Sequence, residues 1–185
     1  MLDLQEDNIL DQLNQHPDVF GVLSTATKLI DQAVDTLILK VFNKEHHAKR
    51  FVIPSLIGHN GPLNELSVKL KLLYALSIIS HNEYEDIELL TAILDELKQD
   101  KHTTYTFIDD EILGPISLLH DMVLPPDLPI KKKPTQEVGI IDNMKSSIYN
   151  QRFQQTIRSA LIISITTLIT GLVEKQNIQY FPDNI

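Results

Sequence analysis

The strongest helical pattern in the chain lies in residues 18–43, DVFGVLSTATKLIDQAVDTLILKVFN. Its apolar positions recur at steps of four and three, which keeps side chains on one face of an α-helix. These positions are Val19, Leu23, Ala26, Ile30, Ala33 and Leu37. A second apolar face, formed by Phe20, Val34, Ile38 and Val41, predicts that this helix is central. Asp18 precedes the pattern and is a residue type that favours the N-cap.

The other segments also show helical patterns, separated by helix breakers. We predict helices over 2–15, over 45–57 with an interruption near Pro54, over 62–80, over 83–98 with His81 and Asn82 as its cap, and over 142–175. Asp109 to Glu111 open a further short helix that Gly114 and Pro115 interrupt, and residues 104–107 favour a brief extended piece. The run 161–165 is rich in β-branched residues, so it is the least typical part of the last helix.

These patterns predict an all-α protein. We expect a compact multi-helix single domain over residues 1–185, with a long central second helix and a long C-terminal helix. A Pro/Lys-rich segment at 124–139 has the composition of a linker.

The composition excludes several classes of protein. The chain has no cysteine, so thiol nucleophiles and zinc–thiolate sites are absent. It has no phosphate-binding loop, dinucleotide fingerprint or hydrolase motif, and we predict no catalytic residue, cofactor or metal. The longest uncharged stretch, 159–173, is shorter than the roughly 20 residues that cross a bilayer. The acidic first residues are not those of a signal peptide, so we expect a cytoplasmic protein without a membrane segment.

The charge is unevenly distributed along the chain. The formal net charge of −9 combines −12 over residues 1–127 with +3 over residues 128–185. Proteins that bind nucleic acid depend on Lys and Arg to neutralise phosphates, so most of this chain would repel DNA. The basic exceptions, which are candidate DNA contacts, are Lys131, Lys132, Lys133, Lys145, Arg152 and Arg158.

Ser67, Lys71 and Tyr74 form a polar stripe on the leucine-rich helix at 62–80, since they are spaced at i, i+4 and i+7. A lysine on a half-buried stripe needs a partner. One interpretation is a structural network with acids of the next helix, such as Glu88 or Asp95. The other is a polar pocket for an anion near the start of the helix.

Residues 83–111 are strongly acidic, with a net charge of −8. They are interpreted either as solvated helix faces or as a docking face that steers a basic partner. The candidate docking residues are Glu83, Glu85, Asp86, Glu88, Asp109, Asp110 and Glu111.

The run 61–76, GPLNELSVKLKLLYAL, resembles the signature of the mannitol operon repressor family. Three other segments fit the same family in order: 38–42, ILKVF; 83–90, EYEDIELL; and 107–115, FIDDEILGP. The last helix also matches in character, and the likeness covers about residues 18–175. The sequence departs from the family pattern at two positions. Asn64 follows Gly-Pro-Leu, where a glycine is common, and Ser77 takes the place of a small residue late in the same helix. The resemblance implies an all-α repressor of the operon for mannitol uptake and utilisation, without catalytic residues.

The resemblance and the charge together favour a repressor that acts through another protein, either a regulator or a component of the sugar phosphotransferase system. One alternative is a repressor that binds DNA directly through its basic C-terminal third. Another is a sensor of a sugar phosphate anchored on Ser67, Lys71 and Tyr74. A homo-oligomer is compatible with any of these.

Overall fold

The computed structural model describes residues 5–41, 55–56, 58, 61–100, 104–124 and 140–177, with the backbone alone over 140–146. These residues form helices and no strand, which confirms the all-α fold. The helices are α1 (Glu6–Asn14), α2 (Val19–Val41), α4 (Leu66–Ala75), α5 (His81–Gln99), α6 (Asp110–Ile116) and α7 (Ile140–Lys175). Most of the predicted helix at 45–57 and all of 125–139 lie outside the described residues.

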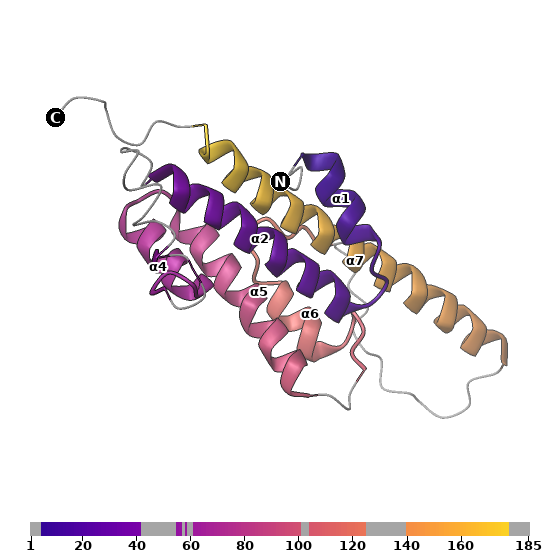
Figure 1. Ribbon diagram of the computed structural model, residues 1–185. Helices are drawn as coiled ribbons and strands as arrows, with labels where there is room; N and C mark the ends of the chain where they lie inside the picture. The colour runs from indigo at the N-terminus through magenta and orange to yellow at the C-terminus, as the bar shows by residue number, and fades with distance from the viewer. Residues whose placement is uncertain are drawn as a thin grey trace.

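The second helix is central, as predicted (Figure 1). α2 contacts α1, α4, α5 and α7, and its buried residues run along its whole length. Each fully buried Leu or Ile contributes about 1.5–3 kcal/mol relative to an exposed one. Asp18 caps the helix, since its Oδ1 accepts a hydrogen bond from the Gly21 amide at 2.8 Å. Phe20 does not belong to the buried face, because 47% of it is exposed.

α7 packs along α1 and α2. Its β-branched run stays helical because Leu161, Ile162 and Ile165 are buried in the core. The N-terminal part of α7 extends beyond α1 (Figure 1), and Ile148 and Tyr149 are exposed there. By length and composition alone, the portion from Ser147 to Lys175 is apolar enough to span a membrane. Half of its most apolar window is buried within the fold.

α4 is shorter at both ends than the predicted helix at 62–80. It starts late because Gly61 lies in a turn, where its amide donates to the carbonyl of Gly58. A Cβ on Gly61 would lie 2.1 Å from the carbonyl oxygen of Leu56, so this turn requires glycine. α4 ends early because Ser77 has a φ of 55°. The amides of Ser77 and Ile78 donate to the carbonyls of Tyr74 and Leu73, which is a Schellman motif.

Two further boundaries differ from the prediction. Ser80 caps α5, whereas His81 and Asn82 lie inside the helix. Pro115 lies inside α6 and does not interrupt it at Gly114, because the helix continues for one residue more. Pro115 has no amide N–H, so α6 lacks one backbone hydrogen bond there. Because α6 has only 7 residues, few other backbone hydrogen bonds are affected. Residues 104–106 have no regular structure and residue 107 lies in a turn, so the extended piece predicted over 104–107 does not pair as a strand with any described residue.

Candidate protein-docking surface

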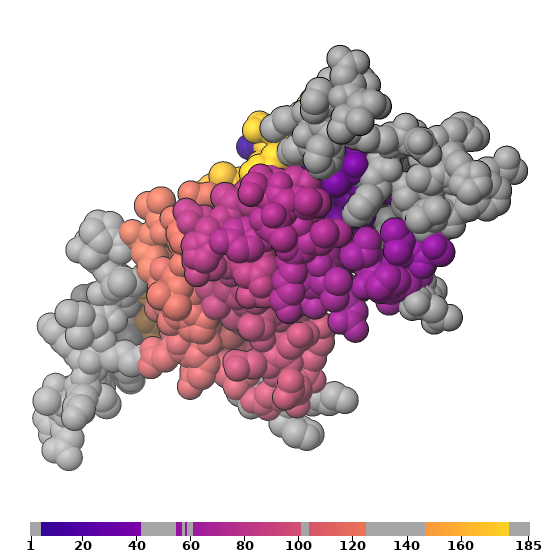
Figure 2. Space-filling model, turned by 90° about the vertical axis from the view of Figure 1, so that its left-hand side faces the viewer, coloured from indigo at the N-terminus to yellow at the C-terminus, as the bar shows by residue number. Residues whose placement is uncertain are grey.

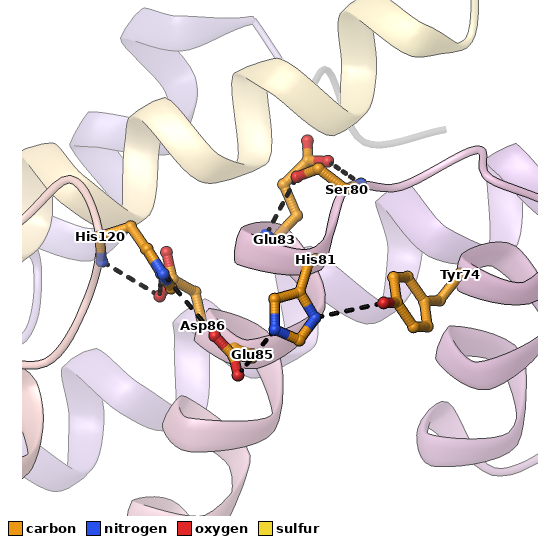
Figure 3. Close-up of polar contacts among 7 residues, drawn as sticks. All are labelled: Tyr74, Ser80, His81, Glu83, Glu85, Asp86 and His120. Carbon is orange, nitrogen blue, oxygen red and sulfur yellow. Dashed lines mark hydrogen bonds and ion pairs between the residues drawn. The ribbon is translucent and has the colours of Figure 1, made fainter.

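A capping box fixes the position of the first side chains of α5 (Figure 3). Ser80 Oγ accepts a hydrogen bond from the Glu83 amide at 3.2 Å, and Glu83 Oε2 accepts one from the Ser80 amide at 2.7 Å. Two amides that have no partner within the helix are satisfied in this way. The helical repeat then places His81 and Glu85 on the same side of α5.

Glu83 also ties α5 to the end of α7. Lys175 Nζ donates to both carboxylate oxygens of Glu83, at 2.7 and 2.6 Å. Burial tends to raise the pKa of Glu83, but the hydrogen bonds from Lys175 and Ser80 outweigh it, so the pKa lies below its ordinary value. Glu83 is therefore a structural residue and not an exposed docking acid.

His120, from the turn after α6, is held against α5 by Asp86 (Figure 3). Asp86 Oδ1 lies 2.8 Å from His120 Nδ1 and accepts a hydrogen bond from the His120 amide at 3.2 Å. The Asp86 side chain is only 7% exposed, whereas that of His120 is 35% exposed. The hydrogen bond to Asp86 raises the pKa of His120, and the charges of Asp86, Glu85 and Asp121 add to this against an opposing effect of burial.

Glu85 joins this histidine to a second one. Its Oε1 lies 3.1 Å from Nε2 of His81, and its Oε2 lies 3.7 Å from Nε2 of His120. On the far side of His81, the hydroxyl of Tyr74 lies 3.3 Å from Nδ1. A continuous polar chain therefore runs from the end of α4, across the first turns of α5, to the turn after α6.

Tyr84 extends the chain towards Glu88. Its ring stacks on that of Tyr74 at a centroid distance of 5.0 Å, and its hydroxyl donates to Glu88 Oε1 at 2.5 Å. This hydrogen bond raises the pKa of Tyr84.

Large apolar side chains are exposed beside this polar chain. Leu118 and Val123, which flank His120 in sequence, are 70% and 81% exposed, and Leu76 at the end of α4 is 41% exposed. Exposed apolar residues with a polar rim are typical of protein-binding surfaces. Figure 2 shows that the segments from α4 to α6 form one continuous face. We define the α5–α6 surface as the exposed residues Tyr74, Leu76, His81, Glu85, Glu88, Asp110, Glu111, Leu118, His120 and Val123.

The seven predicted docking acids do not lie on one face. Glu83 and Asp86 point inward, and Asp109 Oδ2 accepts a hydrogen bond from the Thr106 amide at 2.7 Å. Those that are exposed are Glu85, Glu88, Asp110 and Glu111. His81 and His120 were not predicted from the sequence as site residues. The contact of His120 with Asp86 spans 34 residues, so no local pattern shows it.

The predicted polar stripe faces the solvent. Ser67, Lys71 and Tyr74 are all exposed, so the expectation that Lys71 is half-buried was wrong. The buried lysine is Lys69, which is 2% exposed and pairs with Asp31 and Asp35 of α2. The signal for this ion pair in the sequence was Asp31 and Asp35, two acids that lie four residues apart on an otherwise apolar helix.

Of the candidate DNA contacts, Lys131, Lys132 and Lys133 lie outside the described residues, and so does the side chain of Lys145. Arg152 is exposed on α7. Arg158 is half-buried and donates to the carbonyls of Asn14 and His16, at 3.0 and 2.9 Å. Its guanidinium therefore caps the C-terminal end of α1.

Comparison with known proteins establishes the family. A family model described as "Mannitol repressor" matches residues 5–173. The chain belongs to the mannitol repressor family. It is 40% identical over 174 residues to the mannitol operon repressor of Escherichia coli K12, covering 94% of this chain and 85% of that protein. The resemblance drawn from residues 61–76 is thereby confirmed.

Solved structures agree with this mannitol repressor fold. The X-ray structure of the MtlR–HPr complex from Escherichia coli matches with a TM-score of 0.79 and 39% identity, covering 91% of this chain and 98% of that one. A possible transcriptional regulator YggD from Shigella flexneri shares the fold, with a TM-score of 0.71 and 24% identity over 93% and 99% of the two chains. A more distant relative, Fumarase E of Escherichia coli K12, is 24% identical over 180 residues, covering 93% and 99% of the two proteins.

Proposed function

We propose that this chain represses a mannitol operon by binding another protein, and that the partner is a phosphotransferase component of the HPr type. The observation that carries the proposal is the likeness to the MtlR–HPr complex, whose repressor chain is covered almost completely. The charge of −12 over residues 1–127 supports it, because that charge favours a protein partner over DNA. Such a repressor would act in the cytoplasm, where the operon is transcribed.

The α5–α6 surface is the proposed docking site. It combines exposed apolar residues with exposed acidic residues, and protein interfaces bind through a few apolar anchors surrounded by polar contacts. The polar chain from Tyr74 to His120 holds the surface in one arrangement before the partner arrives, which lowers the entropic cost of binding. Its acids would attract a partner with a basic surface.

The test is a calorimetric titration of the chain with HPr from the same organism. We expect saturable binding that Leu118→Ser weakens by roughly tenfold, as for the loss of an apolar anchor. Ile163→Ser is the matched control, since Ile163 is 60% exposed but lies on α7. No binding would overturn the choice of partner, and equal loss or no loss in the two variants would overturn the choice of surface.

Direct DNA binding is the alternative, through Arg152 and the lysines at 131–133 and 145. Titration with the control region of a mannitol operon at two salt concentrations distinguishes it. Specific binding that weakens steeply with salt would favour this alternative, whereas our proposal expects none.

We further propose that the chain is not an enzyme, although relatives at 23–24% identity are named Fumarase E. The support is that the more similar relatives are named repressors and that no catalytic motif is present in the sequence. An assay of fumarate hydration tests this. Hydration of fumarate by the parent chain that is lost in His120→Asn would overturn the proposal that the chain is not an enzyme. His120 is the residue to replace because the His120–Asp86 pair is the arrangement best suited to a general base.

A further inference from the structure

We infer that a second site, a polar pocket between the α1–α2 turn and the middle of α7, binds a small polyhydroxylated molecule of the sugar-alcohol class. The pocket has a volume of about 630 Å³, within the range of small-molecule sites. It involves none of the residues of the α5–α6 surface, so the inference does not depend on the proposed partner.

The lining of the pocket is unusually rich in amide side chains. Five of its eight lining residues are amides: Asn14, Gln15, Gln151, Gln154 and Gln155. Each primary amide offers two donors and an acceptor, and a hydroxyl group is both a donor and an acceptor. A lining rich in amides therefore matches a ligand that carries hydroxyl groups along its length, and matches a purely apolar ligand poorly.

The glutamines of α7 are available to a ligand. Gln151, Gln154 and Gln155 are spaced at i, i+3 and i+4, so they share one face of the helix. Within the part of the chain that the structure describes, their side chains make no hydrogen bond, and neither does that of Gln15. Solvation alone accounts for a single exposed amide, but four amides that line one pocket form a hydrogen-bonding set.

The other three lining residues are Arg158 and two apolar residues, Pro17 and Phe107. Phe107 is 1% exposed, so its ring is fixed in the core where it borders the pocket. Because so little of that ring is exposed, Pro17 is the apolar residue that a ligand can contact directly. The lining therefore offers amides to the hydroxyl groups of a polyol and a small apolar surface to its C–H groups.

The wall formed by the α1–α2 turn is fixed before a ligand arrives. Arg158 bonds the carbonyls of Asn14 and His16, and no carboxylate pairs with Arg158 among the described residues. His16 packs so closely on Gly21 that a Cβ there would lie 2.8 Å from the histidine side chain. This preorganisation reduces the entropic cost of binding. The positive charge of Arg158, which no carboxylate neutralises among the described residues, lets the pocket accept a phosphate ester of the polyol as well as the neutral compound.

The experiment is ligand-observed saturation-transfer NMR on the full chain, with mannitol, mannitol 1-phosphate and fumarate as probes. We expect saturable binding of at least one of the two polyol compounds. Gln151→Ala combined with Gln154→Ala should weaken it by roughly tenfold, as for the loss of about two hydrogen bonds. Gln99→Ala is the matched control, since Gln99 is an exposed glutamine at the end of α5. The variants should melt at nearly the temperature of the parent, because both pocket residues are at the surface or partly buried.

Tighter binding of mannitol 1-phosphate than of mannitol would assign the phosphorylated form as the ligand, and equal binding would assign the neutral polyol. The inference is overturned if neither compound binds, if only fumarate binds, or if polyol binding survives the double substitution.

Discussion

Lys69 Nζ lies 2.6 Å from Asp35 Oδ1, and this ion pair ties α4 to the central helix α2. Asp31 makes a second contact with the same ammonium group. Burial alone would lower the pKa of Lys69, but the hydrogen bonds and charges of the two aspartates outweigh it and raise the pKa. The lysine is therefore charged at neutral pH although it is 2% exposed.

Lys69→Ala should lower the free energy of unfolding by about 2 kcal/mol. Removing one partner of a buried ion pair costs roughly 3–5 kcal/mol, but Asp31 and Asp35 are 44% and 37% exposed and water can reach them, which reduces the loss. Chemical denaturation measures the change. Lys71→Ala is the control and should have little effect, because Lys71 is exposed. A larger loss for Lys71→Ala than for Lys69→Ala would contradict this assignment.

Ser77→Gly should stabilise the protein by about 1 kcal/mol. Ser77 occupies the left-handed position of the Schellman motif, with a φ of 55°, where a residue with a Cβ costs roughly 1–2 kcal/mol and glycine costs none. The melting temperature should rise by about 2–4 °C for a chain of this size. Ser67→Gly, within α4, should lower stability by roughly 0.5 kcal/mol. If both glycines are destabilising, Ser77 does not adopt this conformation in solution.

These two positions show how far the sequence predicts the structure. The period of apolar residues in α2 predicted a central helix, and Asp18 predicted its start, because both signals are local. The end of α4 was missed because the left-handed position carries serine and not the usual glycine. Lys69 was missed because Lys71 lies on the more regular polar stripe, and only the packing of α4 on α2 shows which lysine is buried. The contact of His120 with Asp86 depends on the packing of α6 against α5, so no local pattern revealed it.

Asp86→Asn should lower the pKa of His120, which NMR titration of the imidazole measures. The folded-state pKa of this histidine is raised by Asp86. The stabilisation from protonated His120 is therefore fully present below its ordinary pKa of about 6.5 and is lost as the pH rises through the folded-state value. Asp121→Asn should have a smaller effect, since the Asp121 charge is the weakest contribution. An unchanged pKa in Asp86→Asn would show that the pair does not form in solution.

The exposed acids of the α5–α6 surface should control how fast the partner binds. Rim charges attract an oppositely charged protein over distances of about 10 Å at roughly 0.1 M salt and over longer distances at lower salt, so they act on the association rate more than on dissociation. Glu88→Lys and Glu111→Lys should each slow association with HPr several-fold in stopped-flow measurements and weaken its dependence on salt. Asp7→Lys makes the same change of charge on α1, and it should have a smaller effect because α1 lies apart from this surface. If all three variants slow association equally, the net charge of the protein guides the encounter and the acids of this surface have no special role. If only Glu88→Lys and Glu111→Lys slow association and Asp7→Lys does not, the approach of the partner is directed to the face formed by α5 and α6.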